Sequence, residues 1–167
     1  MNIQDVLLIY DYNYWANNCI LTASEKVSAE QYAAPASFPF GGLRGTLVHI
    51  LNAEYGWQRI FQSGDGAAPD LTEEQFPTLA GLQERWREEE KAMRAYLAGL
   101  HDEDLPGPLR YKNNSGVNRE RVLWHCLLHV VNHGTQHRSE AAALLTDYSQ
   151  SPGDLDFTVF LNDYKKP

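Results

Sequence analysis

Cysteine is scarce in this sequence, which has two in 167 residues. Cys19 and Cys126 stand far apart, and no Cys-x-x-Cys spacing occurs. This scarcity argues against a fold built on disulfides and against a cysteine-rich structural zinc site. Both cysteines stand in apolar, helix-like surroundings, which predicts reduced and buried thiols.

Long apolar runs and excess positive charge are also missing. No stretch of about 18 apolar residues occurs, so no transmembrane helix is expected. Residues 1–5 lack the basic and apolar regions of a signal peptide, so we expect a cytoplasmic protein. Lys and Arg number 14 against 22 Asp and Glu, a formal net charge of −8. That balance argues against nucleic-acid and anionic membrane partners, which require positive charge. The charged run 85–91 is interpreted as a solvated helix face.

Apolar periodicity predicts an all-α chain. A length of 167 residues without internal repeats favours a single domain, 1–167. Thr78 is a good helix N-cap. Apolar periodicity also predicts a short helical segment at about 155–161, after the last main helix. The four main helices are expected at about 3–24, 43–62, 78–99 and 118–146. The connections are expected to be a loop over 28–42 and a segment over 101–118, with a short extended piece at 109–112 and a turn at 113–116.

Histidine is concentrated in the last predicted helix. His125, His129, His133 and His137 are each four residues from the next. Residues four apart lie on the same helix face, and imidazole is the commonest protein ligand for transition metals. A helix advances about 100° per residue, so the direction drifts by about 120° between the first and the last of them. One ion can therefore bind a neighbouring pair but not all four.

The surroundings of these histidines separate them into two pairs. His125 and His129 stand among apolar residues, which predicts packing or support of a ligand. His133 and His137 stand in a polar run typical of an open cleft, and we predict that they are metal ligands. Glu140 shares the face of His133, seven residues away. It is the candidate catalytic residue, as a proton acceptor or by orienting a ligand, and an exposed helix carboxylate is the alternative.

A third ligand has to come from another element. Catalytic zinc sites commonly have three protein ligands and one open position. His101 precedes an acidic segment that reads as a solvated turn, which leaves His49 in the predicted helix 43–62. A lone histidine on an apolar face is more often a core residue, but the pair at 133 and 137 lacks a partner. We therefore predict His49 as the third ligand.

For several other residues, the sequence allows either a functional or a structural role. Arg138 could pair with an anionic substrate or be a surface charge. Several aromatic residues could form the wall of a pocket or pack in the core: Tyr12, Tyr14, Trp15 and Trp57.

Segments along nearly the whole chain resemble the DinB/YfiT-like family of four-helix-bundle metalloenzymes. The strongest match is the late histidine motif, 129–138. The other matching segments are 10–18, 47–57 and 152–157. The resemblance implies a four-helix bundle, a homodimer, and a divalent metal held by His49, His133 and His137. The sequence departs from the family pattern at Gln136, where the family often has histidine, and at 139–140, where Ser-Glu replaces Gly-Gln.

The resemblance also suggests a reaction. Similar proteins are metal-dependent thiol transferases and a thiol-dependent isomerase. Three neutral imidazoles leave the charge of a divalent ion uncompensated, so the ion remains a strong Lewis acid. We expect an enzyme that acts on a small-molecule substrate, transferring a low-molecular-weight thiol to an electrophile or carrying out a related reaction. The alternatives are a metal-dependent hydrolase and a non-catalytic metal-binding stress-response module. Zinc and nickel rank first among the candidate metals, ahead of iron and manganese.

Overall fold

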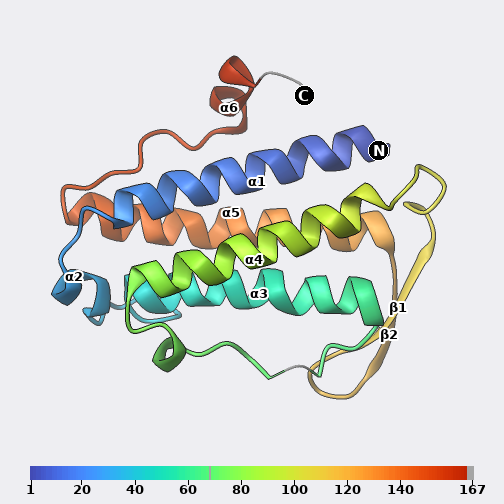
Figure 1. Ribbon diagram of the computed structural model, residues 1–167, viewed down its shortest axis with the longest axis horizontal. Helices are drawn as coiled ribbons and strands as arrows, with labels where there is room; N and C mark the ends of the chain where they lie inside the picture. The colour runs from blue at the N-terminus through green and yellow to red at the C-terminus, as the bar shows by residue number, and fades with distance from the viewer. Residues whose placement is uncertain (68, 165–167) are drawn as a thin grey trace.

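Four long helices lie side by side in the computed structural model, which describes residues 1–67 and 69–164 (Figure 1). They are α1 (Ile3–Ser24), α3 (Leu43–Ser63), α4 (Leu79–Ala98) and α5 (Leu123–Asp147). Helix α6 (Phe157–Asp163) packs on the outer side of α1. The predicted four-helix bundle with a short C-terminal helix is therefore confirmed. None of the described helices is both long enough and apolar enough to cross a membrane.

The connection between α3 and α4 runs along the bundle. Helices α3 and α4 point in the same direction, and the described parts of the connection between them, 64–67 and 69–78, run along the outside of α3 (Figure 1). Gly64 ends α3 with a left-handed φ of 70°, a conformation that glycine adopts without steric cost. A single turn of 3-10 helix, Glu73–Gln75, lies within this connection. Thr78 then caps α4 as predicted, because its side chain accepts a hydrogen bond from the Gly81 amide.

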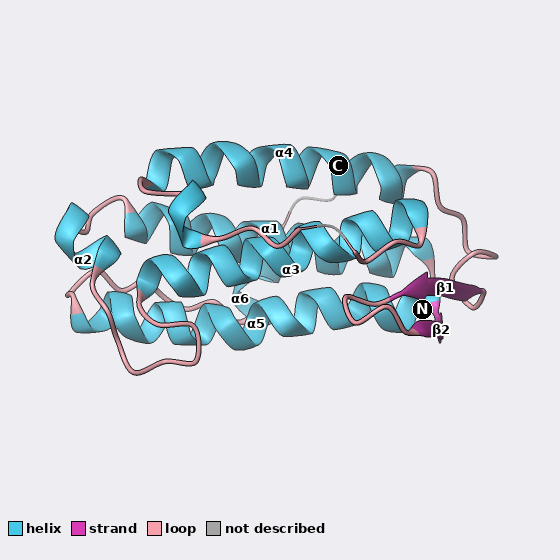
Figure 2. Cartoon of the chain, turned by 90° about the horizontal axis from the view of Figure 1, so that it is seen from below, coloured by secondary structure: helices cyan, strands magenta, loops and turns pink. Residues whose placement is uncertain are grey.

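Two short elements lie at opposite ends of the bundle (Figure 2). An antiparallel hairpin of β1 (Pro108–Lys112) and β2 (Asn118–Val122) lies at one end, and the five-residue helix α2 (Ala29–Ala33) lies at the other. The predicted extended piece at 109–112 is confirmed within β1. The prediction that the last long helix begins at 118 is wrong, because residues 118–122 pair with β1 and α5 begins at Leu123.

Helix α2 lies where only a loop was predicted. Its signal is the Ser28-x-x-Gln31 capping box, in which each side chain binds the other residue's backbone amide. The local sequence therefore contained the information for this short helix.

A polar layer interrupts the apolar core. One apolar cluster surrounds Tyr10, Leu97 and Leu127, and the other surrounds Leu51 and Leu145. Burial of these side chains is the main force that holds the helices together. The residues between the clusters along the helices are polar yet buried, and they lie beside the candidate site: Asn13, Asn17, Glu54 and Arg138.

Candidate metal centre

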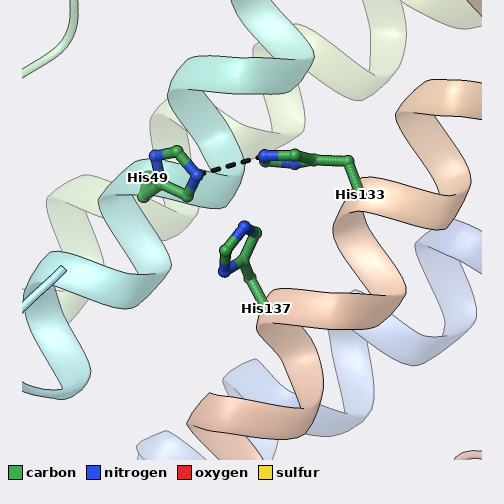
Figure 3. Close-up of side chains that lie close together, drawn as sticks. All are labelled: His49, His133 and His137. Atoms are coloured by element: carbon green, nitrogen blue, oxygen red, sulfur yellow. Dashed lines mark hydrogen bonds between the residues drawn. The ribbon is translucent and has the colours of Figure 1, made fainter. Parts of the chain in front are cut away.

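Three histidines from two helices point toward one another (Figure 3). His49 comes from α3, and His133 and His137 come from α5. One ring nitrogen from each lies within 4.8 Å of the others, and the Nε2 atoms of His49 and His133 are 3.1 Å apart. The three residues predicted as ligands are thus brought together and could hold a metal ion.

The environment favours the neutral form of two of these imidazoles. Burial, and next the charge of His137, lowers the pKa of His49 from 6.5 to about 4. Burial likewise lowers the pKa of His133 to about 4, with the same neighbour adding to the effect. An imidazole must be unprotonated to bind a metal. Both side chains are therefore in the ligand form at neutral pH.

Glu140 lies behind His137. Its Oε2 is 2.8 Å from the Nδ1 of His137, one helical turn earlier on α5. This contact suits the tautomer in which Nδ1–H donates to the carboxylate and Nε2 is left for a metal. Among the described residues, no carboxylate or thiol joins the three nitrogens in the cluster. The donor set is therefore that of an open three-histidine site.

Phe40 covers one face of the site, a feature that the sequence analysis missed. Its ring stacks on His49 with centroids 3.4 Å apart, and its edge meets His137. Gly45 permits this approach, because a Cβ there would lie 1.9 Å from the Phe40 carbonyl oxygen. The only sequence signal was an aromatic and glycine-rich stretch in the loop before α3.

The remaining histidines lie outside the cluster. His125 is exposed and packs edge-on against Trp124, with ring centroids 4.1 Å apart. His129 is exposed too, and it packs against Trp57 with centroids 5.2 Å apart. Contact with a tryptophan agrees with the packing or support role predicted for both. His101 is exposed, as expected for a solvated turn.

Arg138 is buried. The two predictions for it, a surface charge or a partner for an anionic substrate, are therefore both wrong. Arg138 is 2% exposed, and its Nη1 donates to the Oδ1 atoms of Asn13 and Asn17 at 2.6 and 2.9 Å. The guanidinium passes close to Gly134, where a Cβ would lie 2.7 Å from Nη1. Glycine at 134 therefore makes room for the buried charge.

Glu54 balances Arg138 through the same two asparagines. Its Oε1 accepts from the Nδ2 atoms of Asn13 and Asn17, and its Oε2 accepts from Trp86 Nε1 at 2.7 Å. Burial raises the pKa of Glu54, although its hydrogen bonds and Arg138 oppose that shift. A buried charge is tolerated only when such partners satisfy it. The network joins α1, α3, α4 and α5 next to His137, and it holds α3 and α5 in register.

The aromatic residues divide between core and cleft. Tyr12 and Tyr14 are buried in the core, and Trp15 packs against it. Trp57 also lines the cleft that reaches His49. Core packing therefore describes Tyr12, whereas Tyr14, Trp15 and Trp57 contribute both to the core and to the wall of a pocket.

Comparison with known proteins identifies the family of this chain. The sequence model described as the DinB family matches residues 1–164. The chain is also 27% identical over 164 residues to Protein DinB of Bacillus subtilis (strain 168), covering 95% of each chain.

Proposed function

We propose that this chain, which belongs to the DinB family, is a divalent-metal-dependent enzyme that transfers a low-molecular-weight thiol to an electrophile or carries out a related thiol-dependent reaction. The single observation that supports the proposal is the cluster of His49, His133 and His137, with three ring nitrogens within 4.8 Å of one another. Three protein ligands leave a position open to substrate, which is typical of catalytic sites.

The chain's own residues would hold and orient the ion. The three imidazoles would be the ligands, and Glu140 would act as a positioning residue through His137 Nδ1. A bound divalent cation supplies Lewis acidity, which lowers the pKa of a thiol or a water beside it. Proton acceptance from that thiol is the alternative role for Glu140. Zinc and nickel are our first candidates for the metal, ahead of iron and manganese.

Two other functions remain alternatives. A metal-dependent hydrolase would use the same open position for water instead of a thiol. A non-catalytic metal-binding stress-response module would need the ion only for structure, and closed structural sites normally have four protein ligands. The cluster contains three among the described residues, which favours an enzyme.

We extend the proposal to the localisation, the domain organisation and the oligomeric state of the protein. We place it in the cytoplasm as a single domain, 1–167, with no nucleic-acid partner. Two free cysteines suit a reducing compartment. We also propose a homodimer, supported by apolar side chains left exposed on the surface, among them Leu128 on α5 and Leu161 on α6. A monomer in light scattering at micromolar concentration would contradict the dimer.

One experiment tests the enzymatic core of the proposal. Metal content of the purified protein is measured by elemental analysis, and thiol transfer is assayed against a panel of electrophiles. We expect stoichiometric divalent metal and a transfer rate that disappears in His49→Ala. The matched control is His101→Ala, which changes an exposed histidine outside the cluster. Metal bound without any thiol-dependent turnover would favour the alternatives.

A further inference from the structure

A cleft lies along α3 and reaches His49, one of the three residues of the candidate metal centre. Its volume is about 280 Å³, and His49 forms part of its lining. The returning chain after α3 and the end of β1 form its sides. The cleft therefore offers space for a small molecule beside one of the three proposed metal ligands.

Hydrogen bonds hold both sides of the cleft in place. Asn52 donates from Nδ2 to Asp70 Oδ1 at 3.1 Å, and its Oδ1 accepts from the Leu71 amide at 2.8 Å. At the other end, the Gly66 amide donates to the Lys112 carbonyl, and the Lys112 amide donates to the Gly64 carbonyl. The cleft is consequently preformed rather than created by a ligand.

Gly56 forms the floor of this cleft, in the middle of α3. Glycine is among the least favourable residues in a helix interior. Apart from its two chain neighbours and the adjacent backbone of α3, no heavy atom among the described residues lies within 4 Å of the position that a Cβ would occupy at Gly56. Gly45 and Gly134 differ, because a Cβ there would meet Phe40 and Arg138. No neighbouring element of the described structure would exclude a side chain at 56, and the open space there would let a ligand approach the backbone of α3 closely.

The walls indicate the chemistry of that ligand. Trp57 and Tyr111 pack against each other, with ring centroids 5.5 Å apart and planes tilted by 59°, and together they offer an aromatic surface to an apolar ligand. Asp70 is the one carboxylate among the described lining residues, which include no lysine or arginine. Arg59 and Arg85 lie over the ring of Tyr55, but neither belongs to the described lining, and Arg85 forms an ion pair with Glu89. The formal net charge of −8 also attracts cations and repels anions.

We propose that this cleft binds an amine-bearing aromatic small molecule, with its ring over Gly56 and against Trp57 and Tyr111, and with its ammonium group toward Asp70. The assignment of this ligand as the acceptor substrate of the metal centre rests on the proposed function. Binding itself requires only the cleft. It can therefore be measured in the metal-free protein.

The test compares probes of similar shape and different charge. Metal-free protein at pH 7 is titrated calorimetrically with 2-phenylethylamine, 2-phenylethanol and phenylacetate. We expect the amine to bind about tenfold more tightly than the carboxylate, a difference within the range of one charge-assisted hydrogen bond. In Asp70→Asn, the affinity for 2-phenylethylamine should no longer exceed the affinity for 2-phenylethanol.

Gly56→Ala separates ligand binding from stability. The added methyl group should raise the midpoint temperature of thermal unfolding, because alanine favours the helix. It should also lower the affinity for 2-phenylethylamine about tenfold, because it occupies space on the floor of the cleft. The control is Gly81→Ala on α4, whose Cβ would meet only Thr78 Oγ1, at 3.6 Å. It should leave binding unchanged. Unaltered amine binding in Gly56→Ala, or tighter binding of phenylacetate, would overturn the proposal.

Metal binding distinguishes this inference from the proposed function. Zinc is titrated separately into the same wild-type preparation. The titration is repeated with nickel, iron(II) and manganese(II), and amine binding without stoichiometric binding of any of the four metals would support the cleft and overturn the metalloenzyme. Zinc binding and thiol transfer without amine binding would overturn the cleft assignment alone.

Discussion

His137 Nδ1 lies 2.8 Å from Glu140 Oε2, and this contact determines which nitrogen of His137 is left for the centre. His137 is almost fully buried, with 6% of its side chain exposed, so the ring has little freedom to turn away. A carboxylate in this position also makes the imidazole a stronger donor to a metal. The pair therefore links a residue outside the cluster to the affinity of the cluster.

We predict that Glu140→Ala weakens zinc binding by about tenfold to a hundredfold without loss of helicity, because the His137 ring loses its hydrogen-bond partner. Competition with a chromophoric chelator measures the affinity, and circular dichroism monitors the fold. Glu140→Gln should retain part of the affinity, since an amide oxygen can still accept from Nδ1–H. Wild-type affinity in Glu140→Ala would show that the contact does not matter.

His133→Ala or His137→Ala should abolish stoichiometric divalent metal binding, because only two imidazoles would remain in the cluster. His125→Ala should retain most of the metal, since that exposed side chain lies outside the cluster. Native mass spectrometry counts bound ions directly. Full occupancy in the double variant His133→Ala/His137→Ala would rule out this site.

His49→Ala should lose metal or activity while the bundle stays folded, because the core depends mainly on apolar burial. His101→Ala is the control and should behave like the wild type. Metal content reports the site, and circular dichroism reports the fold. If His101→Ala lost metal and His49→Ala kept it, the choice of third ligand would be wrong.

Arg138→Met should lower the free energy of unfolding by about 3–5 kcal/mol, since it leaves the buried Glu54 without its compensating charge. Urea unfolding monitored by circular dichroism measures the loss. Arg138→Met/Glu54→Leu should be less destabilised than the single variant, because no buried charge then remains in the network. A double variant that loses the sum of both single effects would contradict the coupling.

The metal-free protein should lose stability as the pH falls from 6.5 toward 4. The pKa of His49 and His133 is about 4 in the folded chain, against an ordinary value of 6.5. In this window the unfolded chain binds more protons than the folded chain, so the free energy of unfolding decreases as pH decreases. Above pH 6.5 these two groups add no pH dependence.

Urea titrations between pH 7 and 4.5 in the presence of a chelator measure this slope. The variant His49→Gln/His133→Gln is the comparison, because glutamine does not titrate. It should show a shallower decline than the wild type. Equal slopes would mean that the two imidazoles have ordinary pKa values in the folded chain.

Local signals determined much of the architecture in advance. Apolar periodicity and caps such as Thr78 predicted the ranges of α1, α3 and α4. Each predicted end lies within one residue of the observed end. The pairing of His133 with His137 is equally local, because a spacing of four is one helical turn. Such features depend on neighbouring residues, so the sequence reveals them.

Other features depend on contacts between distant residues. Residues 118–122 form a strand because β1 lies beside them, and Arg138 is buried because α1 presents Asn13 and Asn17 to it. Phe40 over His49 and the open floor at Gly56 likewise exist only once helices and loops have packed. The sequence alone determined which side chains could be ligands. The packing of α3 against α5 decided that His49 meets His133 and His137, because only tertiary contacts bring residues 84 positions apart within 3.1 Å.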